Sequence, residues 1–210
     1  MNKIIAILGI AALLVGVSVQ VYKSNHKGDI RSQLQNATYL YDQLKIVPKF
    51  QFIDHEGQPF TNEDLKDQWT LWFFGFTHCP DICPTTLSIL TGVINQLEEE
   101  HGIENTSIIF VSVDPERDTP DKMKAYANAF HEDAIGITAY DETLAPFLRN
   151  MGIIATIQKQ NDFQTDYLVD HSSAVYLIAP DTGISALFSV PHRIDTITDD
   201  FLTIRKHHSS

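Results

Sequence analysis

The only two cysteines of this 210-residue chain, Cys79 and Cys83, stand in the segment CPDICP. The apolar run at residues 69–76 predicts a buried strand before them, and the apolar spacing after them predicts a helix over residues 83–101. If Cys79 lies near the helix N-cap and Pro80 takes the first helical position, the two cysteines share one helix face, with Cβ atoms roughly 5–6 Å apart. Such a pair can chelate one metal ion or close into a disulfide.

A helix start also bears on how reactive the two thiols are. Helix N-termini favour anions, so both thiols should be more acidic and more reactive than free cysteine. The alternative is that Cys79 and Cys83 are buried core residues, which behave as small hydrophobic side chains. The strand-to-helix context and the prolines at positions 80 and 84 favour the reactive pair.

Strand and helix patterns alternate from residue 48 onward. A strand at 50–53 comes before the strand at 69–76, and a second buried strand at 108–113 follows the helix, which predicts parallel strands joined by a right-handed crossover. The later elements are expected as a helix over 120–130 with Thr119 as N-cap, a strand at 135–138, a helix over 142–151, an extended segment at 153–158, strands at 174–178 and 184–190 around a turn, and a closing helix over 194–205. The pattern is typical of an α/β sandwich with a mixed central sheet, and it resembles the thioredoxin-like fold.

Four segments carry a resemblance to a known family. They are FGFTHCPDICP at residues 74–84, VSVDPERDT at 111–119, DYLVDH at 166–171 and YLIAPD at 176–181. Together they resemble the signature of the Sco/SenC family, thioredoxin-fold copper proteins tethered to respiratory membranes. The resemblance spans residues 50–201, without a departure at the positions that would carry chemistry.

The resemblance implies a third metal ligand, a histidine before a late strand, and His171 occupies that place. From the sequence alone, His171 is one of nine histidines, and His78 beside Cys79 would be the first candidate. In a thioredoxin-like fold, however, the loop before the third strand of the sheet faces the start of the active-site helix. His171 is therefore expected at the cysteines, and His78 is expected to point away. Asp170 either orients the imidazole or is an ordinary loop carboxylate.

Two thiolates and one imidazole form a soft, three-coordinate ligand set that suits copper, as Cu(I), Cu(II) or both. Structural zinc normally takes a fourth protein ligand, and none is evident in the sequence. A peroxiredoxin is disfavoured because Thr77 lies two residues, not three, before Cys79 and no proline stands at position 73. With three methionines, the chain is not a methionine-rich copper carrier.

Residues 4–22 contain no charged side chain. As a helix they would span roughly 28 Å, close to the hydrocarbon thickness of a bilayer. A cleavable signal peptide is the alternative, but residues 17–20 make a poor cleavage site and no lipobox cysteine is present. We therefore expect an uncleaved single-pass anchor in a bacterial inner membrane with the domain on the periplasmic side, although Lys23, Lys27 and Arg31 oppose this orientation.

The expected organisation has five parts: a cytoplasmic end at 1–3, the transmembrane anchor at 4–22, a linker at 23–45, a thioredoxin-like copper-binding domain at 46–206 and a tail at 207–210. The linker is expected to hold a short helix around residues 34–44. The net charge of −12 speaks against nucleic acid, whose phosphates require Lys and Arg. We expect residues 114–118 to form a solvated turn rather than a partner-docking loop, and His207 and His208 to be frayed.

Two functions of different class remain open. The resemblance implies a metallochaperone that passes copper to the binuclear copper centre of cytochrome c oxidase, with the copper-acceptor subunit of that oxidase, a copper donor and a thiol reductant as partners. The alternative is a thiol-disulfide oxidoreductase that keeps the acceptor's cysteines reduced, or a redox or copper sensor. The dithiol of Cys79 and Cys83 serves either function, so enzymatic activity stays open. His171 favours copper, because a dithiol reductant does not need it.

Overall fold

The computed structural model describes residues 29–43, 45–159, 161 and 167–209. The chain divides into two compact units, residues 1–33 and 34–210. The first contributes one described element, the short 3-10 helix η1 (Ile30–Gln33). The expected cytoplasmic end (1–3) and membrane anchor (4–22) lie outside the described residues. Of the helices described, none combines the length and the apolar character needed to cross a bilayer.

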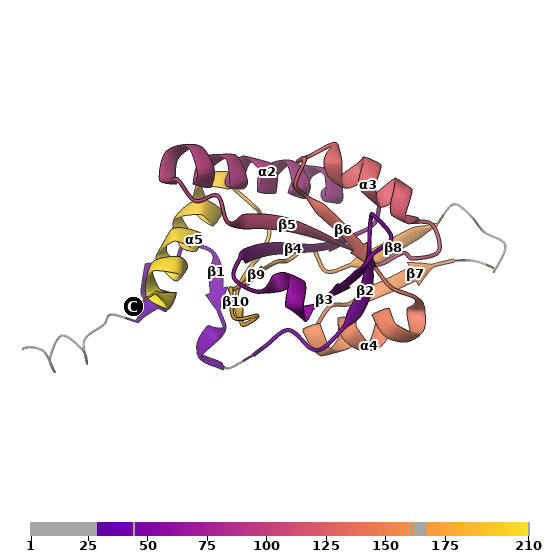
Figure 1. Cartoon of the computed structure of the whole chain (residues 1–210), viewed down its shortest axis with the longest axis horizontal. Coiled ribbons are helices and arrows are strands. Elements are labelled where there is room, and N and C mark those ends of the chain that lie inside the picture. The colour runs from indigo at the N-terminus through magenta and orange to yellow at the C-terminus, as the bar shows by residue number, and fades with distance from the viewer. Residues whose placement is uncertain (1–28, 44, 160, 162–166, 210) are drawn as a thin grey trace, which may run out of the picture. The chain divides into compact units, whose positions relative to one another are not determined.

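The second unit is built around an eight-stranded mixed sheet in the order β1-β10-β9-β4-β5-β6-β2-β3 (Figure 1). Its strands are β1 (Ala37–Tyr39), β2 (Gln51–Asp54), β3 (Pro59–Thr61), β4 (Trp69–Gly75), β5 (Thr106–Ser112), β6 (Ile135–Thr138), β9 (Val175–Ile178) and β10 (Ile184–Phe188). Two further 3-10 helices are η2 (Tyr41–Gln43) and η3 (Asn62–Leu65). A separate hairpin consists of β7 (Ala155–Gln158) and β8 (Leu168–His171).

The centre of the sheet is the predicted βαβ unit. β4 and β5 run parallel from Trp69↔Thr106 to Gly75↔Ser112, and β4 also pairs with β9 in antiparallel orientation. Parallel neighbours need a crossover, which α2 (Ile82–His101) supplies before ending at Gly102 in a left-handed conformation. All seven residues of β4 are buried, as expected for a strand covered on both faces. The order β5-β4-β9-β10 confirms the thioredoxin-like fold and its mixed sheet.

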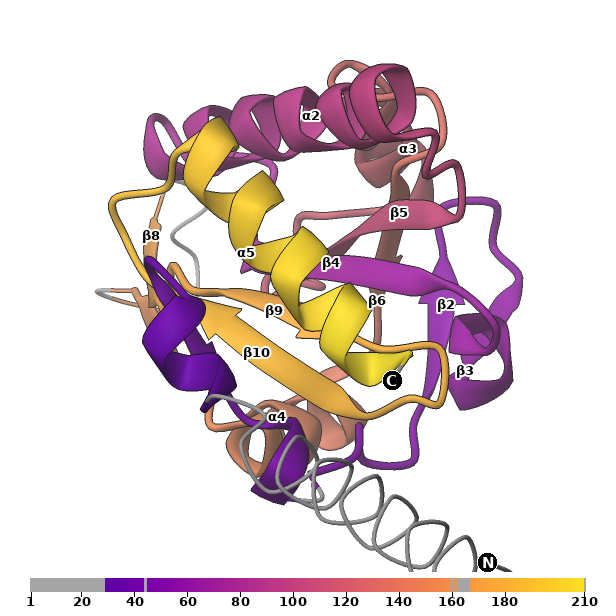
Figure 2. The same cartoon turned by 90° about the vertical axis from the view of Figure 1, so that its left-hand side faces the viewer.

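Helices cover both faces of the sheet. α2 and α3 (Pro120–Asn128) lie on one face and α4 (Asp141–Met151) on the other (Figures 1 and 2). α5 (Ile194–His208) packs beside α2. The face under α4 is aromatic, because Phe147 packs against Trp72 at 6.2 Å between ring centroids and against Phe52 at 4.9 Å. This rigid core supports the strand ends at which the cysteines lie.

The segment before β2 differs from the expectation of a linker with a helix around residues 34–44. Residues 37–39 instead form β1, which pairs with β10 at the sheet edge, so the compact unit begins at Leu34. The buried carboxylate of Asp200 on α5 accepts backbone N–H bonds from Gln35, Asn36 and Ala37 at 2.7–2.9 Å. These bonds satisfy three amides of a segment that is too polar for its hydrophobic pattern to reveal a strand.

The C-terminal end also differs, because α5 continues through His208. The frayed tail expected at 207–210 is therefore wrong for His207 and His208. The His207 ring packs edge-on against Tyr39, and the His208 ring packs against Tyr41 and Trp69. Aromatic contacts that no local sequence pattern reveals hold this last helical turn.

Candidate metal centre

The turn between β4 and α2 carries the two cysteines. α2 begins at Ile82, with Asp81 as its N-cap, so Cys79 lies before the helix and Pro80 is not its first residue. The expected arrangement of both cysteines on one helix face is therefore wrong. The backbone N–H of Cys83 instead donates to Sγ of Cys79 at 3.4 Å. One of the N–H groups at the helix start, which lack an acceptor within the helix, thus points at the sulfur of Cys79.

Cys83 lies in the first turn of α2 with a fully buried side chain. Its sulfur packs against the last residue of β4, where a Cβ on Gly75 would approach Sγ to 2.8 Å. The same Cβ would meet the rings of Phe73 and Phe110 at 3.0 and 3.1 Å. Only glycine at position 75 therefore lets the helix start and the strand end approach this closely.

His171 reaches the cysteines from the end of β8. Its Nε2 lies 3.4 Å from Sγ of Cys83, and its Nδ1 lies 3.0 Å from the carbonyl oxygen of Ser172. A carbonyl can only accept a hydrogen bond, so Nδ1 carries the proton and Nε2 presents its lone pair to the sulfurs. The rings of Phe73 and Phe76 pack edge-on around the imidazole at 6.0 and 5.8 Å.

The structure brings the three predicted ligands together. One ligand atom each from Cys79, Cys83 and His171 lies within 4.8 Å of the others. Within the described part of the chain, this group has no fourth histidine, cysteine or carboxylate member. Two soft sulfurs and one imidazole nitrogen fit copper better than a structural zinc ion, which takes four ligands.

Burial controls the electrostatics of the site. It raises the pKa of the Cys83 thiol, and a hydrogen bond with Cys79 raises that pKa further against a smaller lowering by the backbone of Phe76. The expected acidification is therefore wrong for Cys83. Burial also lowers the pKa of His171, although the Ser172 carbonyl and the charge of Asp170 oppose the effect. Both shifts suit a bound cation. Its charge stabilises the thiolate of Cys83, which burial disfavours, and it binds the neutral imidazole of His171, which burial favours.

Two other predicted neighbours of the site have partners of their own. The carboxylate of Asp170 accepts a hydrogen bond from the side-chain amide of Gln158 across the β7–β8 hairpin, and it acts on His171 through its charge. The imidazole is instead oriented by the hydrogen bond that its Nδ1 donates to the Ser172 carbonyl. His78 turns to Thr77 at 3.1 Å and to Asp118 at 3.7 Å, and it is not a member of the ligand group.

Residues 114–118 are not the solvated turn that their four charged residues suggest. Asp114 and Asp118 are 0% and 1% exposed. Asp118 accepts hydrogen bonds from Ser112 Oγ at 2.6 Å, from Thr77 Oγ1 at 2.6 Å and from Thr77 N at 2.9 Å. It therefore fixes the turn that leads to Cys79. Sequence reasoning missed this role, although a segment with three carboxylates directly after a buried strand was a signal.

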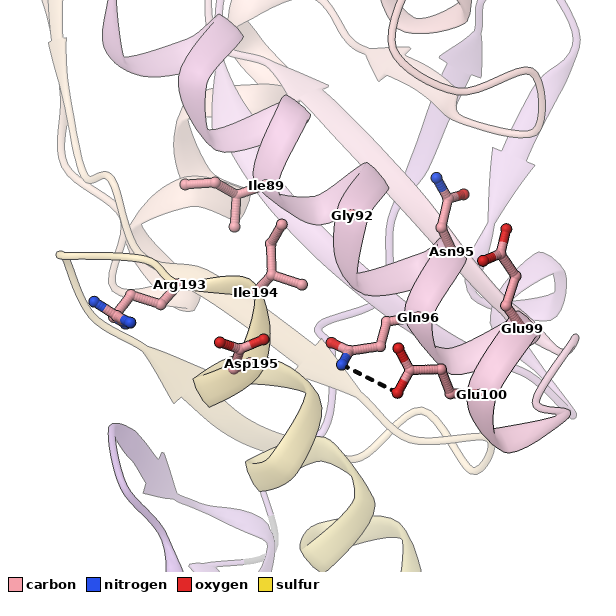
Figure 3. Close-up of a pocket in the computed structure, with 9 residues that line it drawn as sticks. All are labelled: Ile89, Gly92, Asn95, Gln96, Glu99, Glu100, Arg193, Ile194 and Asp195. Carbon is pink, nitrogen blue, oxygen red and sulfur yellow. Dashed lines mark hydrogen bonds between the residues drawn. The ribbon is translucent and has the colours of Figure 1, made fainter.

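A separate pocket lies between α2 and the start of α5 (Figure 3). Its lining carries Glu99, Glu100 and Asp195 together with Arg193, and none of the three ligands. Gln96 donates to Glu100 at 3.4 Å there. The pocket belongs to the packing of the two helices and is distinct from the ligand group.

Comparison with known proteins agrees with this geometry. The model of the SCO1/SenC family matches residues 40–205. The chain belongs to the SCO1/SenC family. Among relatives of this family, "Protein SCO2 homolog, mitochondrial" of Bos taurus is 39% identical over 75% of this chain and 58% of its own length. "SCO2-like protein" of Rickettsia felis is 32% identical over 84% of this chain and 85% of its own length.

A solved SCO1/SenC structure shows the same architecture. The copper-bound crystal structure of Arabidopsis thaliana ScoI is 34% identical, with a TM-score of 0.72 over 78% of this chain and 99% of that chain. Copper is therefore bound by a relative with this fold. The present chain spans a little over half the length of the bovine relative.

Proposed function

We propose that this SCO1/SenC protein is a copper metallochaperone that binds copper through Sγ of Cys79, Sγ of Cys83 and Nε2 of His171. The observation that carries the proposal is the convergence of these three soft ligand atoms within 4.8 Å. The copper-bound Arabidopsis relative supports it. Following the family resemblance, the acceptor is the copper-binding subunit of cytochrome c oxidase, whose binuclear centre receives the metal.

The site is suited to receive copper and to release it. Binding displaces the thiol protons, and the neutral His171 loses none. Three protein ligands leave a position from which an acceptor ligand can approach. Cys83 is fully buried, whereas Cys79 is 9% exposed and the ring of His171 is partly exposed. An acceptor thiol therefore meets the copper from the side of Cys79 and His171, and Cys83 is the last ligand to let go.

A thiol-disulfide oxidoreductase remains the second candidate, because both cysteines are reduced and their sulfurs are close. The raised pKa of Cys83 and the placement of His171 favour copper over this alternative. We further propose a cytoplasmic end at residues 1–3 and an anchor at residues 4–22 in a bacterial inner membrane. The copper-binding domain outside the cytoplasm then includes β1 and continues through His208. The relative from Rickettsia felis supports a bacterial source, whereas the bovine relative is named as mitochondrial.

Copper titration of the full-length, reduced protein tests the proposal. We expect one Cu(I) per chain in competition with a chelator. Cys79→Ser and Cys83→Ser should each remove most of the binding, and His78→Ala should not. Stoichiometric copper in the double cysteine variant would contradict the assignment. Normal oxidase assembly in a strain that carries Cys83→Ser would contradict both the chaperone function and the reductase function, because each needs the two thiols.

A further inference from the structure

The strand that delivers His171 is not part of the main sheet. β8 pairs with β7, with His171 opposite Ala155, and the two strands form a sheet of their own. Backbone hydrogen bonds of the eight-stranded sheet therefore do not fix the position of the imidazole. Contacts of side chains on this hairpin therefore contribute to holding it against the cysteines.

One buried group of side chains makes such contacts. Tyr167, directly before β8, donates its hydroxyl to Oδ1 of Asp114 at 2.7 Å. Nε of Arg117 donates to Oδ2 of the same carboxylate at 2.5 Å. The guanidinium carbon of Arg117 also lies 3.5 Å from the centroid of the Tyr167 ring. Asp114 thus joins the tyrosine and the arginine by charge-assisted hydrogen bonds while their planar groups stack.

The same arginine reaches the loop that carries Cys79. Its guanidinium carbon lies 5.7 Å from the centroid of the Phe76 ring, and the Phe76 ring packs against the imidazole of His171 at 5.8 Å. On the outer side, Lys159 pairs with Glu116 and lies 4.5 Å from the Tyr167 ring. Arg117 therefore lies between the hairpin that bears the histidine and the loop that leads to the cysteines.

We propose that Arg117 and Tyr167, held together by Asp114, are positioning residues for His171. This clamp, defined by these three residues, docks the β7–β8 hairpin and thereby sets how long copper stays bound. The proposal rests on the proposed copper function. Arg117 reaches the His171 imidazole through the Phe76 ring, so the clamp acts on the ligand by fixing its position. Loosening the clamp lets the hairpin withdraw His171 and leaves copper on two sulfurs.

Tyr167→Phe tests the clamp in the full-length protein, because it keeps the ring under Arg117 and removes only the hydroxyl. Loss of a buried hydrogen bond to a carboxylate should make Cu(I) transfer to a chelator roughly tenfold faster. In the metal-free protein, amide exchange of β7 and β8 should also accelerate, while exchange of β4 and β5 stays unchanged. Tyr176→Phe is the matched control, because the Tyr176 hydroxyl is also buried and donates to the Met151 carbonyl at 2.8 Å.

Repeating the substitution in the His171→Ala variant separates an effect on the position of His171 from a general loss of protein stability. With His171→Ala in place, Tyr167→Phe should change copper transfer by less than about twofold, since the ligand that it positions is gone. An equal acceleration in both backgrounds, or none in either, would overturn the clamp. Arg117→Lys, which keeps the charge but not the planar stacking, provides a second variant if Tyr167→Phe does not fold. A wild-type protein that binds no copper would overturn the proposed function, and the clamp with it.

Discussion

Nε2 of His171 lies 3.4 Å from Sγ of Cys83, although 88 residues separate the two in the chain. The Ser172 carbonyl holds the other imidazole nitrogen, so the lone pair of Nε2 already faces the sulfurs before any metal is present. The site is therefore preorganised for a third ligand, a feature that a simple dithiol does not need.

The first prediction concerns His171→Ala. Removing one of three ligands should weaken Cu(I) binding at least about 100-fold, because even loss of a residue behind a ligand costs 10–100-fold. Oxidase assembly should fail at limiting copper and recover in part with excess copper. His101→Ala, at the exposed far end of α2, is the control. Full assembly at limiting copper, together with a null Cys79→Ser variant, would favour the reductase.

The second prediction concerns the redox state of the cysteines. Copper needs both thiolates, so the Cys79–Cys83 disulfide should abolish binding, and dithiothreitol should restore it. Copper content measured before and after reduction checks this expectation. Stoichiometric copper in the oxidised protein would show that the cysteines are not ligands.

The third prediction concerns Gly75→Ala. The added methyl group would collide with Sγ of Cys83, so the metal-free protein should lose about 1–3 kcal/mol of unfolding free energy. The same substitution should cost less in a Cys83→Ala background, where the sulfur is absent. Urea denaturation of the wild type, the two single variants and the double variant measures the cost of Gly75→Ala with and without the sulfur. An unchanged cost in the two backgrounds would place the strain at Phe73 and Phe110 instead.

The fourth prediction concerns pH. Burial lowers the pKa of His171 from 6.5, so the unfolded chain takes up a proton at a pH where the folded protein does not. The stability of the metal-free protein should be fully present above pH 6.5 and should fall as the pH drops below it. The slope from this group is at most about 1.4 kcal/mol per pH unit. In the His171→Gln variant, the urea midpoint should depend less on pH between pH 7 and 5 than in the wild type. The same pH dependence in both proteins would argue against a buried neutral imidazole.

The fifth prediction concerns topology. If residues 4–22 anchor the chain with its domain outside the cytoplasm, alkaline phosphatase fused after residue 210 should be active. A green fluorescent protein fused at the same position should be dark. The reverse pattern would place the domain in the cytoplasm, and the charges of Lys23, Lys27 and Arg31 would then explain the orientation.

Long apolar runs made much of the fold predictable. Residues 69–76 and 108–113 are near-continuous in apolar character, and they became β4 and β5 in parallel register. β1 and β8 were not predicted, because both are three or four residues long and partly polar. The strand character of β1 comes from pairing with β10, which is distant in sequence, and that of β8 comes from the hairpin with β7. Hydrophobic periodicity reports neither pairing.

The site was predictable in its members but not in its geometry. Cys79 and Cys83 follow from their spacing, whereas His171 was identified only through the family resemblance, because nine histidines look alike in sequence. The burial of Asp114 and Asp118 was missed. A carboxylate is normally exposed, and these two are buried because hydroxyl groups from β5, the cysteine loop and the hairpin region donate to them.

The unequal burial of the two sulfurs also determines how the site meets oxidative damage. An oxidant such as peroxide should reach Cys79, which is 9% exposed, more readily than the fully buried Cys83. A sulfenic acid formed on Cys79 then lies within 4.8 Å of a second thiol, and condensation with it releases water and yields a disulfide. That product can be repaired by a thiol reductant, whereas further oxidation to a sulfinic acid could not. Cys83 thus protects the slightly more accessible Cys79 from irreversible loss.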